Sequence, residues 1–238
     1  MAKHLIHLFK IFYHYNKRKI QDLFVYKKRI KKFKTNSEQL FSHSVTLSLP
    51  ILQTETFENK LHNLTTAIDC IQGVCLHQNE ILSFWKQIGY PSAKKGYKEG
   101  RVISNNELKL DIAGGLCQLS GIIYYVSIQS KLNILERHNH SKDIYNDSTR
   151  FTPLGTDASV VYPTKDLRVQ NPFPFPIQFY FDLTNTSLRV NIRSKEKLPT
   201  CSLLFSIENK NGFSKITVKE KNEESDFQKI ISIDHYKI

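Results

Sequence analysis

A cysteine and two histidines are the residues whose types and spacing best fit a chemical role in this chain. Cys117 follows Gly114 and Gly115 in the segment AGGLCQLS, and paired glycines permit a tight turn with close backbone approach. A helix that begins here places the thiol among N–H groups without helical partners, at the positive end of the dipole, which favours the thiolate. The same N–H groups can hold an oxyanion during acyl transfer. We therefore predict that Cys117 is a nucleophile.

A thiolate nucleophile needs a base, and the segment ERHNHS supplies two candidates about twenty residues later. An antiparallel return after the helix would bring His138 and His140 back beside the glycine turn. One imidazole can take the proton while the other orients it or holds substrate. Asp157, in the loop PLGTDAS, is the candidate third member that fixes the histidine tautomer.

Two other interpretations of these residues stay open. Cys117, His138 and His140 could instead hold a metal ion, with a fourth position left for water or substrate. Alternatively, the glycines only end a strand, the thiol is a small buried apolar group, and the histidines are solvated. The first alternative predicts zinc in the purified protein, and the second predicts the slow chemistry of an ordinary thiol.

Substrate contacts are expected on both sides of the cysteine. Gln118 can donate to an oxyanion, and Gly114 and Gly115 allow backbone contact with a ligand. Tyr97 and Arg101 lie in a basic, glycine-flanked segment and are candidate anion or substrate contacts. We expect Trp85, in an apolar run, to pack in the core.

The hydrophobic pattern predicts a mixture of helices and strands around this site. Helical spacing indicates helices over 61–75 and 116–130, and the first of these ends near Gly73. A strand or loop is predicted at 36–56, a short strand and then a turn at Gly89–Pro91 within 78–90, and a short strand or hairpin at 101–110. Further extended segments are predicted, in chain order, at 132–140, 158–162, 167–170, 177–183, 188–193, 201–207 and 215–219. On the strand 132–140 the alternation would put Glu136, His138 and His140 on one face.

The positive charge is concentrated at the start of the chain. Of the net charge of +12, ten charges fall between Lys3 and Lys34, where eleven Lys or Arg accompany one acid, Asp22. A nucleic-acid-binding domain more often spreads its basic residues over its folded face, so we expect no nucleic-acid partner. The segment 3–34 reads as basic amphipathic helix, which fits an anionic membrane surface or packing on the domain equally well. Four cysteines without a CxxC pair suggest a reducing compartment.

Taken in order, several segments resemble the VanW family. They are SFWKQIG (83–89), GYKEGRVI (96–103), GGLCQLSGIIYYVSI (114–128), ILERHNHS (134–141), GTDASVV (155–161) and DLRVQNPFPFPIQF (166–179). The family takes its name from an accessory protein of glycopeptide-resistance clusters, and some members are thought to be cysteine-dependent L,D-transpeptidases. The resemblance implies Cys117 as nucleophile and His140 as its histidine, with His138 beside it. Ala113 stands where the family often has another glycine.

The sequence thus predicts an α+β protein with a glycine-turn, helix and strand unit and a β-rich C-terminal half. We expect a basic leader over 1–35, a VanW-like domain over 36–220 with its best match at 76–195, and a polar tail over 221–238. The expected ligand is a cell-wall peptide or glycopeptide, acted on by acyl transfer through Cys117 or bound without catalysis. We expect no cofactor. No signal peptide or spanning helix is evident, so the expected location is cytoplasmic or peripheral to a membrane.

Overall fold

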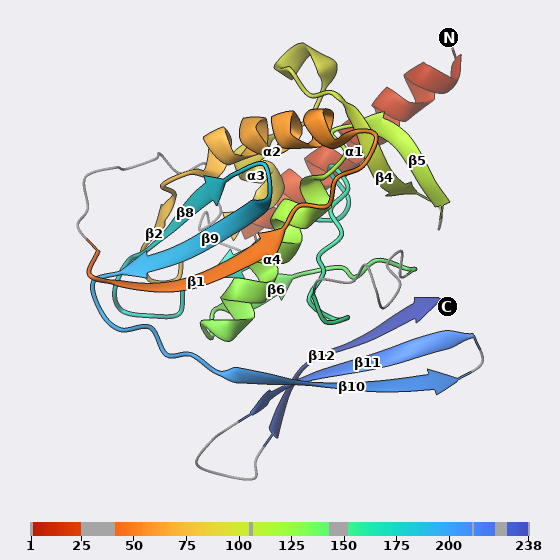
Figure 1. The fold of residues 1–238 in the computed structure, drawn as a ribbon. Helices are drawn as coiled ribbons and strands as arrows, with labels where there is room; N and C mark the ends of the chain where they lie inside the picture. The colour runs from red at the N-terminus through yellow and green to blue at the C-terminus, as the bar shows by residue number, and fades with distance from the viewer. Residues whose placement is uncertain are drawn as a thin grey trace.

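The computed structural model describes residues 2–24, 41–104, 107–142, 152–210, 212–221 and 228–237. The fold is α+β, as predicted, and its C-terminal half consists of antiparallel strands (Figure 1). The helices are α1 (Ala2–Phe24), α2 (Phe57–Ile71), α3 (Phe84–Ile88) and α4 (Leu116–Gln129), with a 3-10 turn, η1, at Ala93–Lys95.

Helix α4 lies at the centre of the fold. Almost every residue from Leu116 to Ile128 is buried, because this helix is apolar around most of its circumference rather than along one stripe. It contacts α2 and a four-stranded antiparallel sheet, which places its first turn between several elements. That sheet has the order β1-β9-β8-β2, with β1 at His43–Pro50, β2 at Cys75–Leu76, β8 at Ile177–Leu183 and β9 at Ser187–Ser194.

Three smaller sheets complete the fold. β3 (Ile81–Ser83), β7 (Arg168–Gln170) and β6 (Asn133–Glu136) form one, and β4 (Glu99–Ser104) and β5 (Glu107–Ile112) form a hairpin. The third contains β10 (Ser202–Lys210), β11 (Phe213–Lys221) and β12 (Gln228–Lys237) and runs beneath the rest of the molecule in Figure 1. Strand β12 occupies most of the predicted polar tail. It buries Asp234 and Tyr236, so this part of the tail belongs to the folded structure.

Three predicted strands differ from the structure. Segment 78–90 contains only the short β3 and then turns into α3, where Ser83 caps the helix by accepting a hydrogen bond from the Lys86 backbone N–H at 3.1 Å. Segment 132–140 is extended only as far as Glu136. Segment 158–162 forms a single bridge, between Val161 and Lys165, and no strand.

The basic leader begins as helix α1, which lies across the domain behind α2 and α4 in the view of Figure 1. The rest of the leader, from residue 25 to residue 35, lies outside the described residues. Among the helices that the structure describes, none combines the length and the apolar character that crossing a bilayer requires.

Candidate active site

The turn before α4 depends on two glycines. A Cβ on Gly114 would sit 2.2 Å from the carbonyl carbon of Gly100, so the β4 backbone can approach only because no side chain is present. Gly115 is the N-cap of α4 and has a φ of +100°, a left-handed conformation that glycine adopts without strain. Together they place Cys117 in the first turn of α4, where backbone N–H groups lack i−4 partners. The predicted glycine-opened helix is therefore present.

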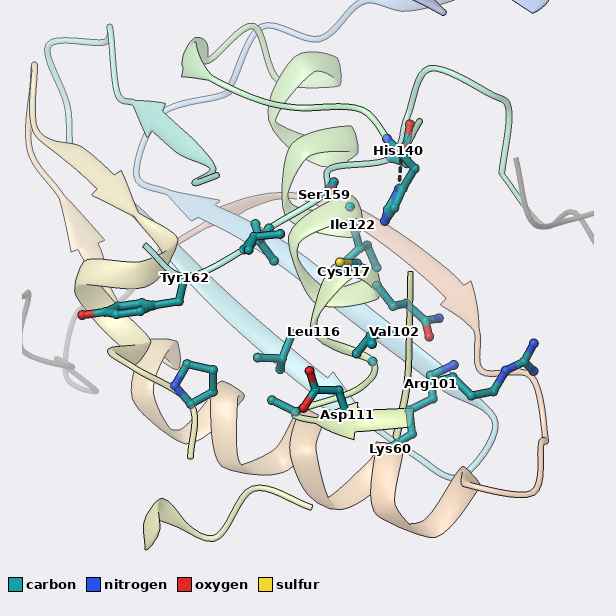
Figure 2. A pocket seen from close by; sticks show the side chains of 18 of the residues that line it. Lys60, Arg101, Val102, Asp111, Leu116, Cys117, Ile122, His140, Ser159 and Tyr162 are labelled. Carbon is teal, nitrogen blue, oxygen red and sulfur yellow. Dashed lines mark hydrogen bonds and ion pairs between the residues drawn. The ribbon is translucent and has the colours of Figure 1, made fainter. Parts of the chain in front are cut away.

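Cys117, His140 and Asp157 come together from three separate segments. His140 reaches toward the sulfur of Cys117 from the opposite wall, as Figure 2 shows. The other ring nitrogen, Nδ1, lies 2.6 Å from Oδ2 of Asp157, which also accepts the His140 backbone N–H at 2.8 Å. This double contact fixes the ring orientation, and it leaves Nε2 for the cysteine.

The charges of this group stabilise one another. Burial alone would raise the pKa of Cys117, but the hydrogen bond and positive charge of His140 outweigh burial and hold the pKa below its ordinary value of 9.0. Burial likewise opposes protonation of His140, yet Asp157 and Cys117 raise its pKa to about 10. His140 and Arg137 lower the pKa of Asp157 to about 2 against the effect of burial. The site therefore favours the ion pair of thiolate and imidazolium over the neutral pair, with Asp157 ionised beside it.

Asp157 is itself held by residues that the sequence did not single out. Arg137 donates to its Oδ1 from 2.9 Å and to its carbonyl oxygen from 2.7 Å, and Tyr236 donates to Oδ1 from 2.5 Å. Arg137 also pairs with Asp234, on the same strand as Tyr236. Arg137 stands inside ERHNHS and could have been suspected there. Tyr236 and Asp234 carry no local signal beyond the alternation of β12.

His138 does not join this group. Its Nε2 lies 3.0 Å from Oε1 of Glu136, on the side of the segment where Glu136 pairs with Arg18 and Arg168. The prediction that both histidines share one face fails because the strand ends at Glu136. The two rings consequently belong to different ionic groups. The metal interpretation needed both histidines, and no group of three potential ligands is arranged for a metal in the described ranges.

The cysteine faces a cavity of about 950 Å³. Gln118 lines it but donates its amide N–H to the Pro50 carbonyl at 2.8 Å, which leaves its Oε1 buried without a hydrogen-bond partner among the described residues. Arg101 lines the cavity as well and lies beside Lys60, below Cys117 in Figure 2. Burial and the charge of Arg101 lower the pKa of Lys60 to about 8. Sequence patterns gave no reason to choose Lys60.

Tyr97, a candidate anion or substrate contact, is buried away from the cavity. Its side chain is only 3% exposed and packs in the main core, and it does not line the cavity. Burial raises the pKa of its hydroxyl, which has no hydrogen-bond partner within the described parts of the chain. Trp85, by contrast, is buried as predicted and donates from Nε1 to the Lys165 carbonyl at 2.7 Å.

Fold and site together define an α+β protein in which a helix-start cysteine faces a histidine and an aspartate. The sequence family described as "VanW like protein" matches residues 59–193, more than half of the chain. The chain therefore belongs to the VanW family.

Two curated relatives support this membership. The chain is 27% identical over 131 residues to the vancomycin B-type resistance protein VanW of Enterococcus faecalis, covering 55% of this chain and 48% of that protein. It is 30% identical over 120 residues to the uncharacterized protein YoaR of Bacillus subtilis, covering 50% and 38%. The chain thus spans less than half of the length of either relative. No solved structure is similar enough to count as a match.

Proposed function

We propose that this protein is a cysteine-dependent acyltransferase of the L,D-transpeptidase type that acts on cell-wall peptides. One observation carries the proposal: His140 contacts both Cys117 and Asp157 at the wall of a large cavity, with the pKa of the thiol lowered and the pKa of the imidazole raised. Such a pair is the activated nucleophile of cysteine acyl transfer. The relation to a vancomycin resistance protein supports a cell-wall substrate.

In the first half of the reaction, the Cys117 thiolate attacks the carbonyl carbon of a peptide bond. The oxyanion that forms lies near the N–H groups of the first turn of α4. As the C–N bond breaks, the imidazolium of His140 gives its proton to the leaving amine. A thioester on Cys117, a neutral imidazole and a free amine result.

In the second half, an acceptor amine attacks the thioester. Neutral His140 takes the proton of that amine, a new amide forms, and the sulfur leaves as the thiolate that pairs again with the imidazolium. Asp157 stays ionised throughout, because its hydrogen bonds from His140, Arg137 and Tyr236 favour the carboxylate. Its part is to hold the ring and its charge in place.

Lys60 and Arg101 extend the proposal to the substrate. The side chain of Lys60 packs against Gly115, because a Cβ added to Gly115 would lie 2.8 Å from Cγ of Lys60. Gly115 is only two residues before the nucleophile. No hydrogen bond or ion pair of Lys60 appears in the part of the chain that the structure describes, so its ammonium is available. Because both cations line the same cavity as Cys117, they favour a substrate that carries a carboxylate as well as the reacting carbonyl.

The test is intact mass spectrometry of the protein incubated with purified muropeptides that carry a tetrapeptide stem. The proposal predicts a covalent adduct equal to the acyl portion of the stem, mapped to Cys117 and absent from Cys117→Ser. Cys201→Ser is the matched control and should still form the adduct. Failure of every muropeptide to label the wild type would contradict the transferase proposal.

The same cavity supports a second function, that of a peptide-binding module without catalysis. The observation that favours it is the Lys60 and Arg101 pair, which can hold a carboxylate whether or not the thiolate reacts. Calorimetry with Cys117→Ser separates the two functions. Binding of muropeptides by this variant, together with no labelling of the wild type, would select the binding module.

A further inference from the structure

Helix α1 is docked on the domain through a face that combines two ion pairs with two apolar residues. Ile11, Tyr15, Arg18 and Asp22 recur at steps of four, three and four residues and therefore share one side of the helix. Arg18 binds Glu136 through two hydrogen bonds, at 2.7 and 2.6 Å, and Asp22 lies 2.8 Å from Arg168.

Two further contacts of the same face are apolar. Ile11 lines the cavity of the candidate site, and Tyr15 stacks on Tyr162 with ring centroids 6.4 Å apart. The domain thus contacts the inner face of α1 through both ion pairs and apolar groups.

The opposite face of α1 is apolar and uncovered. From Phe9 onward, where side-chain exposure is described, each large apolar side chain of this face is at least half exposed: Phe9, Phe12, Tyr13, Ile20, Leu23 and Phe24. At 100° per residue they fall within one broad stripe centred opposite Arg18. An ordinary surface helix turns its apolar stripe toward the core, so α1 is inverted, and the exposed stripe requires a partner outside the domain.

The charges around this stripe indicate what the partner is. Lys10 and Lys17 border it on one side and Lys19 on the other, and six more basic residues follow within residues 25–34. The rest of the chain is close to neutral, so the positive charge is concentrated beside the apolar stripe. A second copy of the chain would bring these lysines against their own counterparts across a symmetric interface. An anionic lipid surface accepts both the aromatic side chains and the lysines.

We propose that α1 is an interfacial anchor that places the domain on an anionic membrane surface, with its apolar stripe among the acyl chains and its lysines among the headgroups. Because Ile11 of the same helix lines the cavity and Tyr15 stacks on Tyr162, another lining residue, the bound protein would hold this side of the cavity toward the lipid. This inference rests on α1 alone and does not depend on the chemistry of Cys117.

The test is cosedimentation of the full chain with vesicles of phosphatidylcholine alone or with about 30 mol% phosphatidylglycerol. The protein should bind the anionic vesicles, and raising NaCl from about 0.1 to about 0.5 M should weaken binding at least tenfold, because salt screens the lysines. Phe9→Ser combined with Phe24→Ser should reduce binding at least tenfold. Lys10→Gln or Lys17→Gln should each reduce it about fivefold.

The matched control is Phe213→Ser combined with Ile230→Ser, which removes two large apolar side chains, each about half exposed, from the C-terminal sheet. This variant should bind like the wild type. Every variant should keep the wild-type rate of Cys117 alkylation, which shows that the domain is folded. Equal binding by the α1 double variant and the wild type would overturn the proposal. So would a wild-type dimer, seen by light scattering, that the α1 double variant converts to monomers without any change in lipid binding.

Discussion

Replacing Asp157 with asparagine should slow alkylation of Cys117 near neutral pH, because the substitution removes the charge that keeps His140 protonated. The carboxylate contacts both Nδ1 and the backbone N–H of His140, at 2.6 and 2.8 Å. At a charge separation of about 4 Å and an effective dielectric constant of about 20, its attraction for the imidazolium is about 4 kcal/mol, or roughly a thousandfold in proton affinity. The asparagine oxygen keeps one hydrogen bond, so we expect the alkylation rate to fall by about ten- to a hundredfold.

The assay is the rate of iodoacetamide labelling, followed by intact mass as a function of pH. The wild-type rate should be constant from the lowered pKa of Cys117 up to the pKa of His140 at about 10, and should fall only when the thiolate is protonated. Burial raises the pKa of Cys75 and of Cys201, so both should react slowly. Cys117→Ser measures the background that remains.

The comparison is made at about pH 6, where an ordinary thiol is almost entirely protonated. An Asp157→Asn protein with an unchanged thermal midpoint and the wild-type labelling rate at this pH would refute the reasoning. It would mean that the thiolate is stabilised without the imidazolium, and the electrostatic link from Asp157 through His140 to Cys117 would have no effect on the nucleophile.

Three other substitutions test the supporting residues. Tyr236→Phe removes one of the hydrogen bonds to Asp157 and should slow labelling at about pH 6 by only about three- to tenfold in the same assay. Lys60→Met should weaken calorimetric binding of carboxylate-bearing muropeptides by about tenfold. In the wild type we expect this affinity to fall as pH rises through about 8, since Lys60 is charged below that pH and neutral above it. The affinity of Lys60→Met should not change over the same pH range. Gly114→Ala should lower the free energy of unfolding in urea by about 3 kcal/mol, because its Cβ meets the β4 backbone. Gly212→Ala, with open space around its Cβ, should cost only about 1 kcal/mol for its positive φ.

The elements that local patterns specify were predictable from the sequence. The three- and four-residue apolar spacing identified α4, and strict alternation around the turn at Thr184–Ser187 identified the hairpin of β8 and β9. The proximity of Cys117 to His140 could also be anticipated. A helix followed by an antiparallel segment returns the chain to the start of that helix.

His138 shows where such reasoning stops. Period-two alternation predicted one face for both histidines, but the chain leaves the strand after Glu136, where the pairing of β6 with β7 is irregular. The guanidinium of Arg137 is drawn to Asp157 and Asp234, both distant in the sequence. Such tertiary ion pairs override the local alternation, and the residues near Arg137 in the sequence do not predict them.

The same explanation holds for α3. A run of apolar residues this short fits a strand or a helix equally well, and only its surroundings decide. Here Asp166, from the segment before β7, accepts the Trp85 backbone N–H at 3.0 Å and the Ser83 hydroxyl at 2.5 Å. Both contacts stabilise the first turn of a helix. The deciding residue lies more than eighty positions away.

The C-terminal sheet matters for the site although it lies outside the region that matches the family. Arg137 is only 7% exposed, and its charge is balanced by Asp157 on one side and by Asp234 of β12 on the other. Without β12 the guanidinium of Arg137 would pair with Asp157 alone, and the Asp157 carboxylate would lose the hydrogen bond from the Tyr236 hydroxyl. His140 would then compete with Arg137 for the charge that raises its pKa. The basicity of the histidine, and through it the ionisation of Cys117, therefore depends on Asp234, 97 positions after Arg137, and on Tyr236, 79 positions after Asp157.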